Sequence, residues 1–198
     1  MRLKSLGLLS ILMLSIVGGV QAFSPSYPQS YKKVTKDGKS VFVMLAHQYL
    51  TPESKKINER YPRSGLYPND GSKTPLWTVG RYIFDIQMSS DGVYFFEFGW
   101  EQKLGDKGES VAVEFYEKDK SLCRYLIKDL VPRPEAMPII PYGNADGYSW
   151  VKSSVFDDVN NRLTVETIEG EDCPIRKYIF DITTGEIIKD DKTATKKE

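Results

Sequence analysis

The sequence has few of the residues on which enzyme and metal sites commonly depend. Its 198 residues include one histidine, His47, and two cysteines, Cys123 and Cys173. One histidine and two widely separated cysteines do not match the usual spacings of zinc ligands. The sequence also has no G-x-S-x-G pattern, which would indicate a nucleophilic serine that could act with His47. We therefore expect no metal, no cofactor and no catalytic residue, and we interpret His47 as a polar residue at the end of a strand.

The sequence also has no excess of positive or negative charge and no long apolar run after its N-terminus. The 27 basic residues equal the 27 acidic ones in number, so the electrostatic attraction that dominates nucleic-acid binding is not expected. The segment "GDKG" at 105–108 lacks the following helix and the lysine pattern of a phosphate-binding loop. Beyond the N-terminus no apolar run is long enough for a membrane span. Nucleic acid is therefore not an expected partner, and the mature chain should not cross a membrane.

The N-terminus has the layout of a secretory signal peptide. Arg2 and Lys4 precede an apolar run, and small residues lead up to Ala22. We expect cleavage after Ala22, which would place the protein in the periplasm or outside the cell. N-terminal mass analysis of the exported protein should find Phe23 first, and retention of Met1 would contradict this expectation.

The two cysteines lie in the part of the chain that should remain after cleavage. An even number of cysteines in an exported protein permits a disulfide bridge. A bridge between Cys123 and Cys173 would stabilise the fold by about 4 kcal/mol in the chain-entropy model. The alternative is a pair of buried free thiols.

After residue 39 the chain reads as short strands separated by turns. β-Branched and aromatic residues alternate with turn signals rich in Gly, Asn and Asp. The clearest strands are expected at 40–45, 93–98, 110–116, 123–127 and 162–168. One helix is expected at Pro52–Arg60, with Thr51 as its N-cap. We predict a single β-rich domain over 23–189 and a charged disordered tail over 190–198. The fold class is all-β, mainly antiparallel, built as propeller-like blades or a small β-sandwich.

One hexapeptide occurs twice. "RYIFDI" at 81–86 returns as "KYIFDI" at 177–182, and a looser copy, "RYLIKDL", lies at 124–130. A competing alignment of the repeats matches Trp77 with Trp150 instead. Both alignments predict a buried strand that ends at an aspartate and a turn. Tyr82 and Tyr178 are then expected to be buried equivalents.

Several longer segments carry a resemblance. They are "YPRSGLYPNDGSKTPLWTV" at 61–79, "SSDGVYFF" at 89–96, "EFYEKDKSLCRYLIKDLV" at 114–131 and "YIFDITTGEII" at 178–188. Together they resemble a family of uncharacterised exported bacterial proteins. The resemblance implies bacterial export and a β-rich fold, and it assigns no functional residue.

Acidic residues offer only unspecific catalytic or metal-binding candidates. Glu97 with Glu101, or Glu114 with Glu117, could form a carboxylate pair of the kind that glycosidases use. We interpret them instead as polar members of half-exposed strands and turns. The cluster at 157–161 contains two Asp and two Asn, but it lacks the glycine and the distal glutamate of a calcium loop. A turn explains it without an ion.

Two proline-containing loops, at 50–75 and 131–148, are the expected binding surface. Aromatic and arginine side chains often anchor interfaces, and the first loop supplies Tyr61, Arg63 and Tyr67 as contact candidates. The competing interpretation is that these aromatic residues cover the core. We expect an exported, non-catalytic β-domain that binds an unknown protein or glycan partner or an envelope component. The alternative is a secreted hydrolase, for example one that acts on glycans, with acidic residues that the sequence does not identify.

Overall fold

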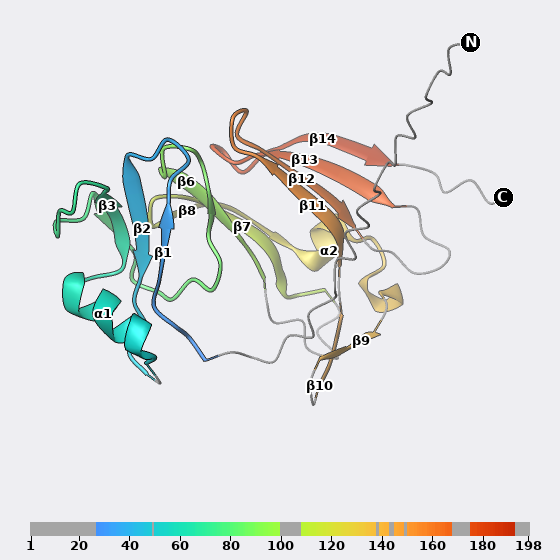
Figure 1. The fold of residues 1–198 in the computed structure, drawn as a ribbon. Helices are drawn as coiled ribbons and strands as arrows, with labels where there is room; N and C mark the ends of the chain where they lie inside the picture. The colour runs from blue at the N-terminus through green and yellow to red at the C-terminus, as the bar shows by residue number, and fades with distance from the viewer. Residues whose placement is uncertain are drawn as a thin grey trace, which may run out of the picture.

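The computed structural model describes residues 27–48, 50–99, 108–137, 139–142, 145–148, 150–167 and 175–192. Within these ranges the protein is built mostly of antiparallel strands, which confirms the predicted fold class (Figure 1). Outside the described residues lie the signal peptide expected at 1–22, Cys173 and residues 193–198 of the expected tail. Residues 190–192, which were expected to begin a disordered tail, instead end strand β14 (Ile187–Lys192). No helix in the described ranges is long and apolar enough to cross a membrane.

Three four-stranded sheets follow one another along the chain. In each sheet, neighbouring strands are consecutive in sequence, which is the connection found in a propeller blade. Sheet 1 contains β1 (Tyr31–Val34), β2 (Ser40–Met44), β3 (Gly65–Pro68) and β4 (Trp77–Thr78). Sheet 2 contains β5 (Gln87–Met88), β6 (Tyr94–Phe98), β7 (Val111–Glu117) and β8 (Lys120–Leu126). Sheet 3 contains β11 (Val151–Asp157), β12 (Arg162–Thr167), β13 (Arg176–Asp181) and β14 (Ile187–Lys192).

Both segments expected to be long loops contain secondary structure. The first holds α1 (Pro52–Arg60), which begins where the sequence predicted, with the Thr51 hydroxyl accepting a hydrogen bond from the Ser54 amide. The same segment contains β3. The second holds a 3₁₀ turn, η1 (Pro134–Ala136), and a hairpin of β9 (Ile139–Tyr142) and β10 (Ala145–Tyr148). A four-residue helix, α2 (Ile127–Leu130), follows β8.

The sheets stack face to face as in a sandwich, with sheet 2 in the middle (Figure 1). Phe42 and Leu66 of sheet 1 pack with Phe95 of sheet 2 in one apolar cluster. On the other face of sheet 2, Phe115 packs with Phe180 of sheet 3, with ring centroids 5.2 Å apart. Because both faces of sheet 2 are covered, five consecutive residues of β7 are buried. This double burial explains the almost uninterrupted apolar run in that strand.

The outer face of sheet 1 is covered by α1. Val41 and Val43 form a third apolar cluster with Tyr61 and Tyr67, and Ile57 of the helix packs against it. Aromatic residues of the 50–75 segment therefore belong to the core rather than to the surface.

The first hairpin turns of sheets 1 and 2 have the same hydrogen bonds. In "TKDGKS" the Thr35 hydroxyl donates to Asp37, and in "SSDGVY" the Ser89 hydroxyl donates to Asp91, at 2.7 and 2.6 Å. The glycine of each turn has a φ near +70° (72° and 73°). The first turns also meet in space, because the Asp37 amide donates to the Ser90 carbonyl and Lys36 pairs with Asp158 of the first turn of sheet 3. The turn shared by 35–40 and 89–94 is therefore a clearer structural repeat than the hexapeptide.

The three copies of the hexapeptide adopt different structures. The copy at 177–182 lies largely in β13, as predicted, and Tyr178 is 2% exposed. The copy at 124–130 divides between β8 and α2. The copy at 81–86 is not a strand, and within it Ile83 and Ile86 are buried whereas Phe84 is 51% exposed. The prediction that each copy is a buried strand is therefore wrong for 81–86, and Tyr82 is only half-buried.

Side chains of β1 take the place of a neighbouring strand at 81–86. The Tyr31 hydroxyl donates to the Ile83 carbonyl at 2.8 Å, and the Lys33 ammonium donates to the Ile86 carbonyl. Backbone groups must find partners when a segment packs into a protein. At 81–86 the side chains of Tyr31 and Lys33 bond the backbone carbonyls, so this segment does not need to pair with a neighbouring strand.

Candidate functional site

A pocket of about 610 Å³ lies between the end of β2, the segments that flank β3 and β4, and the turn joining β7 to β8. Its volume is in the range typical of small-molecule sites. Leu45, Ala46 and Val79 supply buried apolar surface. The remaining lining residues are Pro28, His47, Gln48, Pro62, Arg63, Ser64, Thr78, Gly80, Arg81, Tyr82 and Asp119.

Three backbone amides at the pocket already have hydrogen-bond acceptors within the protein. The Leu45 amide donates to the Ser64 hydroxyl, the Ala46 amide to the Ser30 hydroxyl, and the Gly80 amide to the Asp119 carboxylate. These three amides are therefore not available to a ligand.

Arg81 is held in place on one wall of the pocket. Its guanidinium donates to Asp119 at 2.8 Å and to Glu97 at 2.6 Å, and its central carbon lies 4.1 Å from the centroid of the Tyr116 ring. Two carboxylates and an aromatic face thus fix one arginine. The charge of Arg81 is balanced within the protein.

Glu97 and Glu114 face each other across β6 and β7. The Tyr116 side chain influences the pKa of both carboxyl groups. Burial raises the pKa of Glu97, against the opposing effect of Arg81. Burial also acts to raise the pKa of Glu114, but hydrogen bonds from Ser121, Arg124 and Tyr116 outweigh it and lower that pKa. Two neighbouring carboxyl groups with opposite pKa shifts are an arrangement seen at acid–base sites.

The sequence did not predict this pairing. The pairs suggested by the sequence were Glu97 with Glu101 and Glu114 with Glu117. Glu101 lies outside the described residues. Glu117 lies three positions after Glu114 on the same strand and is paired with Lys120. A signal was nevertheless present, because Glu97 and Glu114 are each the only charged residue within an apolar strand sequence, "VYFFEF" and "SVAVEFY".

The three predicted contact residues do not lie together on a surface. Tyr61 and Tyr67 are 5% and 0% exposed and belong to the core between sheet 1 and α1. The Tyr67 hydroxyl donates to the Arg63 carbonyl at 2.6 Å. Arg63 alone is exposed, and it lines the pocket. Trp150, another aromatic residue beside the predicted loops, is 2% exposed. These aromatic residues therefore cover the core, which was the competing interpretation of the two loops.

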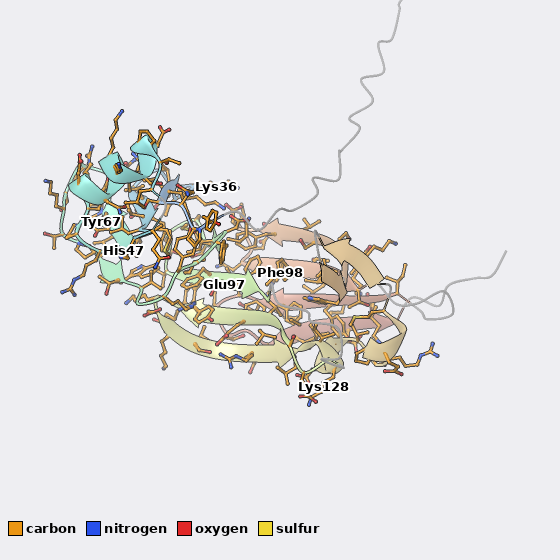
Figure 2. All side chains as sticks on the ribbon, turned by 90° about the horizontal axis from the view of Figure 1, so that it is seen from below. Lys36, His47, Tyr67, Glu97, Phe98 and Lys128 are labelled. Carbon is orange, nitrogen blue, oxygen red and sulfur yellow. The ribbon has the colours of Figure 1, made fainter. Side chains whose placement is uncertain are left out.

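His47 occupies an exposed position on the pocket rim, on the sheet 1 side, whereas Glu97 belongs to sheet 2 (Figure 2). In the predicted turn at 157–161, the Asp157 carboxylate accepts hydrogen bonds from the Val159 and Asn160 backbone amides. Among the described residues, no cluster of three or more His, Cys, Asp or Glu side chains could hold a metal ion.

Cys123 is a half-buried free thiol on β8. Its predicted partner, Cys173, lies outside the described residues, so the disulfide stays a prediction.

Comparisons with known protein families, curated proteins and solved structures found no match to this chain. The pocket and its side chains are therefore the basis for a functional assignment.

Proposed function

We propose that the protein is an exported, non-catalytic β-domain that binds a small polar ligand, such as a unit of an envelope glycan, in the pocket between sheets 1 and 2. One observation carries the proposal: several polar side chains at the pocket have no bonding partner among the described residues. These are His47, Gln48, Arg63 and Thr78. The Arg63 guanidinium can donate hydrogen bonds to a ligand, and the other three side chains can both donate to a ligand and accept from it.

The surroundings of these side chains favour binding. Polar side chains that converge on an apolar floor are characteristic of ligand pockets. The floor belongs to packed strands and their immediate extensions, so ligand binding would require little ordering of the backbone. Tyr82 adds a fixed aromatic ring, because its hydroxyl both accepts from the Gln29 amide and donates to the Gln29 carbonyl.

A binding screen tests this proposal. The mature protein would be applied to arrays of glycans and peptides, and the affinity of each bound compound would then be measured for two variants. Thr78→Trp adds a large side chain at an exposed pocket position and should weaken binding at least tenfold, about 1.4 kcal/mol. Thr74→Trp adds the same side chain at an exposed position outside the pocket and should leave the affinity unchanged. No binding to any compound, or equal effects of both variants, would refute the proposal.

A second candidate is a secreted hydrolase, which the paired carboxyl groups of Glu97 and Glu114 favour. Glycoside hydrolases use two such groups, one held protonated and one ionised. The same screen therefore includes a panel of glycoside substrates. If the protein is a hydrolase, Glu97→Gln should lower turnover at least 100-fold, in line with the loss of a general acid. Glu59→Gln, at an exposed position on α1, is the control. A wild-type protein that cleaves no substrate removes this candidate.

A further inference from the structure

The two arginines that line the pocket differ in their charge balance. Arg81 is neutralised by Asp119 and Glu97, at 2.8 and 2.6 Å. Arg63 makes no ion pair within the described part of the chain, and its side chain is exposed at the pocket. Asp119, the one carboxylate in the lining, is already paired. The pocket thus presents one positive charge that no residue among those described balances.

The backbone around Arg63 is fixed by hydrogen bonds. The buried Tyr67 hydroxyl donates to the Arg63 carbonyl. The next residue, Ser64, accepts from the Val79 amide with its carbonyl and from the Leu45 amide with its hydroxyl. Arg63 therefore extends from a segment that is attached to both β3 and its neighbours. Binding at Arg63 therefore requires little ordering of its backbone.

We propose that Arg63 makes the pocket selective for a carboxylate-bearing sugar. This inference rests on the proposed binding function. A guanidinium presents two parallel N–H groups to a carboxylate, which is a strong and geometrically specific contact. The amide of Gln48, the imidazole of His47 and the hydroxyl of Thr78 can exchange hydrogen bonds with sugar hydroxyl groups. The apolar face of the sugar ring would rest on the floor of the pocket.

A peptide carboxylate fits the same pocket less well. Proteins often capture a peptide C-terminus with a group of free backbone amides, and the Leu45, Ala46 and Gly80 amides here are already bonded. Strand addition is also limited at this site, because β4 is only two residues long. Recognition by side chains favours a ligand rich in hydroxyl groups.

Two sugars that differ at a single group test the inference. Galacturonate and galactose would each be titrated into the mature protein, with binding followed by ¹H–¹⁵N chemical-shift changes. Galacturonate should bind at least tenfold more tightly than galactose, with shifts at the pocket residues. Arg63→Ala should remove this preference, so that the variant binds galacturonate and galactose with equal affinity. Lys73→Ala removes a positive charge from an exposed position outside the pocket, and the preference should survive it.

The possible outcomes separate this inference from the proposed function. Equal binding of the two sugars, or an unchanged preference in Arg63→Ala, would overturn the role of Arg63 while the binding function stands. If an acetylated dipeptide with a free carboxylate binds in the pocket and neither sugar does, the sugar assignment is wrong. If no compound in the wider arrays binds either, the proposed function itself fails.

Discussion

Replacing Tyr178 with serine should destabilise the protein far more than the same replacement of Tyr82, although the two residues occupy matching positions in the repeated hexapeptide. Tyr178 is 2% exposed in the core between sheets 2 and 3, and its hydroxyl donates to the Leu130 carbonyl at 2.7 Å. Serine would leave a large cavity and remove this bond. Removing a buried aromatic side chain costs about 3 to 5 kcal/mol.

The matched replacement Tyr82→Ser should cost about 1 to 2 kcal/mol. Tyr82 is half-buried at the edge of the pocket, so solvent can fill much of the space that its ring leaves. Chemical denaturation of the purified variants would measure both values. Equal costs would show that the two copies of the motif are structurally equivalent after all.

If Tyr178→Ser does not fold, Tyr178→Phe keeps the comparison measurable. That variant retains the ring and removes only the hydroxyl, which leaves the buried Leu130 carbonyl without this donor. A loss of about 1 to 3 kcal/mol is expected for such a group. A change below about 0.5 kcal/mol would indicate that the hydrogen bond adds little to the stability of the interface between sheets 2 and 3.

The second large effect is expected at Gly92, with Gly38 as its matched control. Both glycines occupy the same position of the shared turn, with φ values of 73° and 72°. Alanine in this left-handed conformation costs about 1 to 2 kcal/mol at either site. At Gly38 a Cβ atom would meet nothing within 4 Å. Gly38→Ala should therefore show the conformational cost alone.

At Gly92 the added Cβ atom would lie 2.9 Å from methyl carbons of Leu66 and Thr35. Both residues are buried, at 2% and 3% exposure, so neither can move away freely. Overpacking of this kind adds about 1 to 3 kcal/mol, and Gly92→Ala should cost about 2 to 5 kcal/mol in total. Urea denaturation of the two variants would measure the difference. Equal losses would mean that the contact between the turn and sheet 1 is loose.

Local sequence determined the elements with strong local signals. Thr51 and Pro52 specify the start of α1 because a hydroxyl cap and a proline at the first helical position satisfy the geometry of a helix N-terminus without any distant contact. The turns at 35–40 and 89–94 are likewise determined locally, since the Asp and Gly of each provide the hydrogen bonds and the positive φ. The antiparallel all-β fold follows from such turns between short apolar strands.

Only the tertiary structure decided what the repeated hexapeptide becomes and where the site lies. The same residues form a strand at 177–182, where β12 and β14 provide hydrogen bonds on both sides, but not at 81–86, where Tyr31 and Lys33 side chains bond the backbone. Strand pairing joins residues distant in sequence, so local pattern cannot fix it. For the same reason Glu97 meets Glu114, Tyr67 is buried, and Arg63 reaches a pocket that five separate segments of the chain build.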